Sequence, residues 1–288
     1  RAKGSKIPIV GCLMGGKESA KGLKVLAEGG VPGYQYPERA VGVLRTLAKY
    51  RAWLEKPADE AATFEADREK VKAVFDAARA EGRQDLGELE ARQVLQAYGF
   101  KIPKGGRATS PEEAADLAEE LGFPVVMKIA SSDILHKSDV GGVRLNIEDR
   151  QQAMDVYELI TMRARRYMPE ADIDGVAVQE MIRQGKEVIL GMSCDPQFGP
   201  LVMFGLGGIY VEVLKDVVFR IAPFGREEAK AMIREIGAYP LLTGVRGEKA
   251  ADIEAIEEAL LRLSQLVTDF PEIIEMDINP LKVAEAGR

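Results

Sequence analysis

The sequence predicts an α/β protein of about two domains, in which short buried strands alternate with amphipathic helices. Its 288 residues fit two domains better than one. Residues 6–57 show a strand–helix–strand–helix succession, which is typical of a parallel sheet. After Ile173 strands follow one another directly, as in antiparallel meanders. Hydrophobic residues make up 46% of the chain, which is enough to fill the cores of such domains.

The first segment, residues 1–57, is interpreted as part of a larger domain. "KIPIVGCLM" and "VPGYQY" predict short strands, and a helix over 18–28 ends at a Gly-Gly pair. A second helix begins at Pro37, a residue favoured in the first turn. Two strand–helix units are too few for a complete Rossmann-like or flavodoxin-like sheet. Because the chain starts at Arg1 and ends in "EAGR", we expect both ends to lie inside a longer protein.

Residues 58–85 are interpreted as a charged helical linker. They are rich in Ala, Glu, Asp, Lys and Arg, with apolar residues at helical spacing at Val71, Val74, Phe75 and Ala78. The remainder, residues 86–288, is predicted to form two α+β subdomains around a cleft, about 86–172 and about 173–288. Helices are predicted at 88–98, 110–122, 149–167, 225–236 and 250–269. Strands are predicted in "KIPKGG", "FPVVMKIA", "VRLNI", "GVAVQEMI", "KEVILGMSCD", "GPLVMFG", "VVFRIA" and "EIIEMDINPLKV".

Charge and composition exclude several classes of function. A net charge of -7 argues against nucleic acid or an anionic membrane as the main partner. No apolar run approaches the ~18 residues that a membrane span requires. Cys12 and Cys194 lie far apart, so a disulfide framework is not expected. We therefore expect a cytoplasmic protein whose anionic ligands are held by a few placed cations and backbone amides.

Lys128 and the Gly141–Gly142 pair are candidate phosphate-binding groups. Strand alternation places Lys128 opposite Met127 and Ile129 in an apolar strand, where an ammonium needs solvent or a partner. Glycines let backbone N–H groups converge on phosphate oxygens. A lysine that reaches solvent from an edge strand and a plain hairpin turn are the alternatives. His136, the sole histidine, precedes the glycines in a polar loop and could carry a phosphoryl group, although most single histidines are surface or packing residues.

"EIIEMDINPL" is a candidate magnesium-binding strand. Glu275, Asp277 and Asn279 share one strand face, and oxygen ligands at this spacing suit Mg²⁺ in a nucleotide site. A solvated strand face is the alternative. Asp and Asn are poor strand formers without such a task. The sequence therefore favours the metal interpretation.

Other candidate groups lie at strand ends and in loops. Gln179 to Ile182 end one strand and Glu187 lies in the next. Backbone groups at a strand end suit adenine and a carboxylate suits ribose hydroxyls, although Glu180 and Glu187 could be ordinary rim residues. Arg246 in "TGVRGEK" could reach a phosphate or simply be a surface arginine. "FGLGG" lacks the full G-x-G-x-x-G spacing and no Walker A sequence occurs, so dinucleotide and P-loop interpretations fail.

Four stretches in order carry a family resemblance: "FPVVMKIASSDILHKSDVGGVRL", "GKEVILGMSCDPQFGPLVMFGLGGIYVEVLKDV", "LLTGVRG" and "EMDINPL". Together they resemble the ATP-grasp module of the NDP-forming acyl-CoA synthetases, relatives of succinyl-CoA synthetase, over roughly residues 86–283. Residues 1–57 resemble the C-terminal part of that family's flavodoxin-like ligase domain. The resemblance implies the ATP-grasp fold and the reaction acid + CoA + ATP ⇌ acyl-CoA + ADP + phosphate, through an acyl phosphate and a phosphohistidine.

The resemblance also implies roles for individual residues. Lys128 is expected to contact nucleotide phosphates, and His136 to relay phosphate from a mobile loop with Arg246 as a further catalytic candidate. Mg²⁺ is expected at Asp277 and Asn279. The expected ATP- or ADP-binding residues are Lys128, Gly141, Gly142, Val143, Glu180, Met181, Ile182, Glu187 and Glu212.

The implied partners are a small carboxylic acid, CoA bound mainly by other domains, and the remaining domains or subunit of the same synthetase. A homo-oligomer is expected. The family's principal phosphohistidine, in a Ser-His-Thr-Gly segment, and a further metal-binding aspartate after "INPL" do not occur in this sequence. Two alternatives are a regulatory synthetase-like region of a protein lysine acetyltransferase and another ATP-grasp carboxylate ligase. Retention of the candidate residues favours the synthetase.

Overall fold

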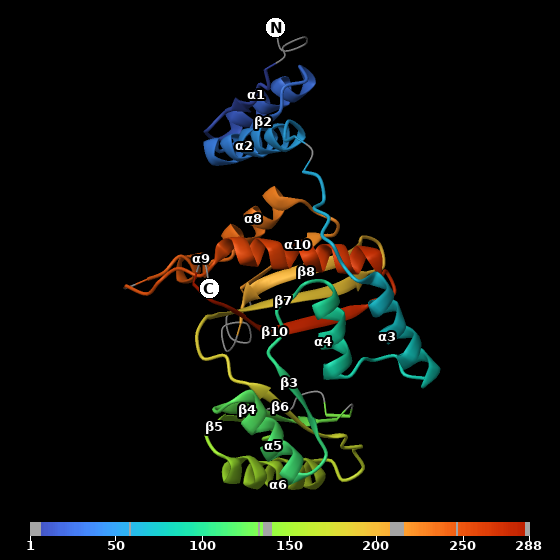
Figure 1. Cartoon of the computed structure of the whole chain (residues 1–288). Helices are drawn as coiled ribbons and strands as arrows, with labels where there is room; N and C mark the ends of the chain where they lie inside the picture. Colours follow the sequence, from blue (N-terminus) through green and yellow to red (C-terminus); the bar gives the residue numbers. More distant parts are fainter. Residues whose placement is uncertain are drawn as a thin grey trace. The chain divides into compact units, whose positions relative to one another are not determined.

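The computed structural model describes residues 7–57, 59–131, 133–134, 140–207, 216–245 and 247–285. The chain divides into two compact units, Arg1–Ala58 and Asp59–Arg288, which are described separately below (Figure 1). No helix in the described ranges is both long enough and apolar enough to cross a membrane.

The first unit is a small parallel β-α-β-α arrangement, as the sequence predicts. Its strands, β1 (Gly11–Cys12) and β2 (Gly33–Tyr34), pair in parallel and are followed by α1 (Lys17–Glu28) and α2 (Pro37–Leu54). Both strands are shorter than predicted, because they pair only with each other and only over two residues each. Ala40 is the one buried residue among those described in this unit, and Trp53 is 63% exposed. So small a unit leaves most of its apolar surface uncovered.

The second unit contains two antiparallel four-stranded sheets. We call the sheet in the order β3-β6-β4-β5 the first sheet. Its strands are β3 (Gly105–Ala108), β4 (Val125–Ala130), β5 (Val143–Ile147) and β6 (Gly175–Glu180). Helices α5 (Pro111–Leu121) and α6 (Arg150–Tyr167) pack on one face and bury a core with its apolar side chains. Side-chain caps start both helices: Ser110 accepts from the Glu113 N–H and Asp149 from the Gln152 N–H.

The second sheet has the order β10-β7-β8-β9. Its strands are β7 (Lys186–Asp195), β8 (Gly199–Leu206), β9 (Val217–Ile221) and β10 (Glu275–Val283). Helices α8 (Arg226–Glu235) and α10 (Ile253–Asp269) cover one face, and the short α9 (Tyr239–Leu242) follows α8 (Figure 1). The core between sheet and helices includes Leu190, Phe204 and Leu260, all fully buried.

The segment expected to be a linker is packed into the second unit. Helix α3 (Arg68–Ala80) buries the four apolar residues that the sequence placed on one face, and three of them, Val71, Val74 and Phe75, join the core of the second sheet. Helix α4 (Glu88–Ala97) contributes Val94 to the same core. The charged composition of this segment therefore belongs to the outer faces of packed helices, because the apolar stripe alone determines burial.

The last strand contains a register shift. Asp277 pairs with Gly191 and Lys282 pairs with Glu187, with an irregularity between Ile278 and Leu281. Such a β-bulge changes which residues face each side of the sheet. Both charged residues consequently lie on the face opposite the core, while Ile278 is buried.

Candidate nucleotide site

Lys128 lies on the face of the first sheet that is opposite α5 and α6. Val125, Met127 and Ile129 are fully buried against those helices, so alternation directs Lys128 to the other side, as predicted. Its register partners are Val143 on β5 and Ala177 on β6. We call the surface formed by Lys128, Val143, Ala177 and Gln179 the Lys128 face.

The glycine pair lies directly beside Lys128. The Gly142 carbonyl accepts a hydrogen bond from the Ile129 N–H at 2.8 Å, and Val143 then starts β5. Gly141 has a φ of +63°, a left-handed conformation that glycine adopts without strain. A Cβ at this position would lie 3.0 Å from the Arg163 guanidinium. The sequence prediction that the chain enters β5 through these glycines, next to the lysine, is therefore confirmed.

The strand end at Glu180 is tied to the chain before β3. The Glu180 N–H donates to the Lys104 carbonyl at 2.9 Å, and the Lys104 N–H donates to Glu180 Oε1 at 2.9 Å. The Glu180 carboxylate therefore already accepts a hydrogen bond from the backbone within the fold. Met181 and Ile182 follow β6 outside any strand, and Ile182 is 40% exposed. Their backbone groups, unlike the Glu180 side chain, are the part of this segment suited to a ligand.

The oxygen-rich residues lie on the outer face of the second sheet. Asp277 faces Gly191, and the row continues to Met203 on β8; Glu187 lies on the same side, paired with Lys282 at 3.4 Å. We call the surface formed by Glu187, Gly191, Met203 and Asp277 the Asp277 face. Asn279 is exposed next to the register shift. Asp277 and Asn279 are thus both exposed to solvent and Ile278 between them is buried, as the sequence predicts.

The electrostatics of Asp277 suit a cation. Loss of hydration on the sheet face raises the pKa of the Asp277 carboxyl, and the neighbouring Glu275 carboxylate raises it further. Gly191 contributes no side chain over this position, so the carboxylate is approachable. In the part of the chain that the structure describes, no cluster of three or more His, Cys, Asp and Glu side chains could hold a metal ion. Asp277 and Asn279 as magnesium ligands stay a prediction, in which phosphate and water would supply the remaining ligands.

Three predicted site residues lie outside the described residues. These are His136, Glu212 and Arg246. The described candidates fall into two groups, one on each sheet. Lys128, Gly141, Gly142 and Val143 adjoin one another on the first sheet, and Glu187, Asp277 and Asn279 belong to the second.

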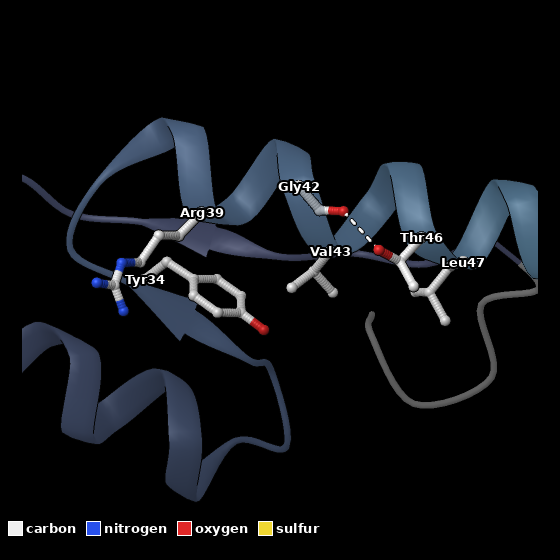
Figure 2. Close-up of a pocket in the computed structure, with 6 residues that line it drawn as sticks. All are labelled: Tyr34, Arg39, Gly42, Val43, Thr46 and Leu47. Carbon is white, nitrogen blue, oxygen red and sulfur yellow. Dashed lines mark hydrogen bonds between the residues drawn. The ribbon is translucent and has the colours of Figure 1, made fainter. Parts of the chain in front are cut away.

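A pocket of about 600 Å³ lies in the first unit, which contains none of the predicted site residues. Figure 2 shows its lining, which comes from β2 and α2 and includes Tyr34, Arg39 and Thr46. The Thr46 hydroxyl donates to the Gly42 carbonyl at 3.1 Å, so it is used within the helix. None of the residues predicted to bind nucleotide lines this pocket.

Sequence reasoning missed the polar residues that surround Lys128. Glu88 Oε1 on α4 lies 3.6 Å from Lys128 Nζ and 2.7 Å from an Arg92 nitrogen. Arg92 also donates to the side chain of Gln179, which is buried on β6. The i, i+4 spacing of Glu88 and Arg92 on a predicted helix was the available signal. Nothing local in the sequence connects that helix to the strand of Lys128.

Two antiparallel sheets, each with helices on one face and polar candidates on the other, are the architecture of the ATP-grasp class. The family model described as an ATP-grasp domain matches residues 77–288. The chain belongs to this family.

Named relatives are ADP-forming acyl-CoA ligases. The chain is 43% identical over 287 residues to a 4-hydroxybutyrate–CoA ligase (ADP-forming) of Nitrosopumilus maritimus, covering all of this chain but 41% of that protein. It is 50% identical over 212 residues to the beta subunit of acetate–CoA ligase (ADP-forming) I of Pyrococcus furiosus, covering 74% of this chain and 91% of that subunit. The chain thus spans about two fifths of the longer relative and corresponds to its ATP-grasp portion.

A solved structure agrees with this assignment. An acetyl-coenzyme A synthetase of Ca. Korarchaeum cryptofilum, described as dinucleotide forming and in complex with coenzyme A, Ca-AMPCP and HgCl+, aligns with a TM-score of 0.73. The identity is 44%, and the alignment covers 75% of this chain and 94% of that one. The ATP-grasp fold expected from the sequence is confirmed.

Proposed function

We propose that this chain supplies the nucleotide-binding, phosphoryl-transfer module of an ADP-forming acid–CoA ligase. The overall reaction is acid + CoA + ATP ⇌ acyl-CoA + ADP + phosphate. The names of the relatives support this proposal. The observation that carries it within this chain is the pairing of Lys128 with Val143, which places the lysine on β4 beside Gly141 and Gly142, the two residues that precede β5.

The triphosphate is bound on the Lys128 face. The Lys128 ammonium neutralises phosphate charge, and backbone N–H groups around Gly141 and Gly142 approach the oxygens without obstruction by side chains. A partly buried ammonium strengthens this attraction because the surrounding apolar strand lowers the local dielectric. Backbone groups of Glu180, Met181 and Ile182 bind adenine, and Glu187 accepts from ribose hydroxyls after exchanging its contact with Lys282.

Mg²⁺ is held by Asp277 and Asn279. When bound, the ion neutralises the charge that develops on the phosphates. The raised pKa of Asp277 supports this assignment, because a nearby cation offsets both the lost hydration and the repulsion from Glu275. Two protein oxygens are typical for Mg²⁺ beside a nucleotide, since substrate phosphates and water complete its shell.

His136 acts as the phosphoryl relay, with Arg246 and Glu212 as further residues of the site. A neutral imidazole nitrogen attacks the γ-phosphorus of ATP, a P–N bond forms, and the P–O bond to ADP breaks, so that ADP leaves with the electron pair and the other ring nitrogen releases its proton to solvent. Arg246 stabilises the transferred group, and Glu212 belongs to the nucleotide-binding set. CoA and the carboxylic acid are bound mainly by other parts of a cytoplasmic, homo-oligomeric synthetase. Residues 1–57 belong to its flavodoxin-like ligase domain, and residues 86–288 form the ATP-grasp domain.

The test uses the full-length protein, assayed for acyl-CoA formation from ATP, CoA and a panel of short carboxylic acids. His136→Ala should abolish acyl-CoA formation and leave binding of magnesium nucleotide nearly unchanged in calorimetry. Lys128→Met should weaken nucleotide binding itself. Lys230→Met is the matched control, because Lys230 is a lysine on α8 whose ammonium pairs with Glu227 at 2.8 Å. Nucleotide binding without acyl-CoA formation by the wild-type protein would contradict the synthetase and favour a regulatory module.

A further inference from the structure

A chain of polar contacts links the strand of Lys128 to helix α4. Glu88 lies between two cations, Lys128 at 3.6 Å and Arg92 at 2.7 Å. Arg92 in turn donates to Gln179, which is 8% exposed and lies on the Lys128 face. The side chains of Glu88 and Arg92 are 27% and 18% exposed, so these pairs are only partly screened by water.

Helix α4 holds Glu88 in a fixed position. Val94 in the last turn of α4 and Tyr98 directly after the helix are buried in the core of the second sheet. The Tyr98 hydroxyl donates to Asp269 at 2.8 Å, and Glu90 caps the helix start by accepting from the Gly87 N–H at 2.7 Å. Both ends of the helix are therefore anchored, and the Glu88 carboxylate is presented from a rigid element.

A lysine on a strand needs such a partner to bind phosphate well. Its long side chain has high rotamer freedom, and ordering it on ligand binding costs free energy. A carboxylate at 3.6 Å restricts the ammonium beforehand, while Arg92 offsets the Glu88 charge so that Lys128 remains available to an anion. Phosphoryl-transfer enzymes of another fold use the same chemistry, in which a strand lysine pairs with a helix glutamate.

We propose that Glu88 is a positioning residue for Lys128, held in place by Arg92, and that it pre-orients the ammonium toward nucleotide phosphates. This inference rests on the proposed nucleotide-binding function of Lys128. It assigns to α4, which is packed into the core of the second sheet, a role at the phosphate site of the first.

The experiment measures the dissociation constant of MgADP and of MgATP by calorimetry on the full-length protein. Glu88→Gln keeps the shape of the side chain and removes its charge, and we expect roughly tenfold weaker binding, the scale of coupling within one ion-pair network. Glu88→Asp keeps the charge on a shorter side chain and should restore part of the affinity. Glu258→Gln on α10 is the matched control, because Glu258 pairs with Arg262 at the same i, i+4 spacing at 2.6 Å, and it should leave both dissociation constants unchanged.

A double-mutant cycle with Lys128→Met separates the possible outcomes. If Glu88 acts through Lys128, Glu88→Gln should have no further effect on affinity in the Lys128→Met background. An equal loss in both backgrounds, or no loss in the wild-type background, overturns the positioning role. If Glu88→Gln does not fold, unchanged affinity of Glu88→Asp overturns it instead. Lys128→Met with wild-type affinity would refute the proposed function itself, which the Glu88 variants alone cannot do.

Discussion

Replacing Asp277 by Asn should change the stability of the protein and its affinity for magnesium nucleotide in opposite directions. The pKa of Asp277 is raised from its ordinary value of 3.8, first by lost hydration and then by Glu275. The ionised carboxylate is therefore less favourable in the folded state than in the unfolded state. Its contribution to stability is most favourable below pH 3.8 and is lost as the pH rises through the folded pKa.

The size of the effect follows from the exposure of the side chain. A shift of one pKa unit corresponds to about 1.4 kcal/mol. Because Asp277 is exposed, solvent screening reduces this, and we expect Asn to stabilise the protein by roughly 0.5 kcal/mol at pH 7. Wild type and variant should converge near pH 3, where the aspartate is protonated in both states. A ligand at 100 times its Kd for the wild type would add about 2.7 kcal/mol to the stability of the wild type and less to that of the variant.

The assay is urea denaturation followed by circular dichroism, with and without Mg²⁺ and ADP. Tryptophan fluorescence is unsuitable, because the single tryptophan, Trp53, lies in the first unit. The reasoning is refuted if Asp277→Asn destabilises the free protein at pH 7. It is also refuted if the variant keeps the full stabilisation by magnesium nucleotide, since the acidic strand face would then be merely solvated.

Three further substitutions test the fold around the site. Tyr98→Phe removes the hydrogen bond to Asp269 and should lower the free energy of unfolding by about 1 kcal/mol in urea; an unchanged midpoint would contradict this. Gly175→Ala should lower the free energy of unfolding by about 2 kcal/mol or more in the same assay, because φ is +130° and a Cβ would lie 2.2 Å from the Ala108 carbonyl oxygen. Wild-type stability of this variant would show that β3 and β6 can move apart at this position without cost. Glu90→Gln should destabilise by about 1 kcal/mol at pH 7, because an arginine partner lowers the pKa of Glu90. That difference should disappear as the pH falls through the folded pKa, and a pH-independent difference would refute the assignment to charge.

Most elements could be predicted from periodicity because each presents one apolar face to a core. The alternation in β4 located Lys128 correctly, since Met127 and Ile129 must face inward whatever the strand pairs with. The same argument located Asp277 on the outer face of β10. The predicted helix boundaries are accurate to within a few residues, because N-cap residues such as Ser110 and glycines at helix C-termini mark them in the sequence.

Contacts between distant segments could not be predicted in this way. The linker interpretation of residues 58–85 relied on charge, whereas burial of α3 depends on the matching apolar surface of the second sheet's core. The Glu88–Lys128 contact likewise joins residues forty positions apart on a helix and a strand. No local pattern encodes such a pairing, because it arises only when the two sheets' elements have packed.

The extra residue in β10 decides which way the end of the strand faces. Five steps along β10 accompany four steps along β7, since Asp277 pairs with Gly191 and Lys282 with Glu187. If β10 kept all its residues and paired in strict alternation, Lys282 would lie on the same side as Ile278, in the hydrophobic interior, and Val283 would lie in solvent. Removing the extra residue would instead give a regular ladder in which Lys282 still pairs with Glu187. The second sheet therefore tolerates the odd residue number of this segment by bulging, without burying a lysine.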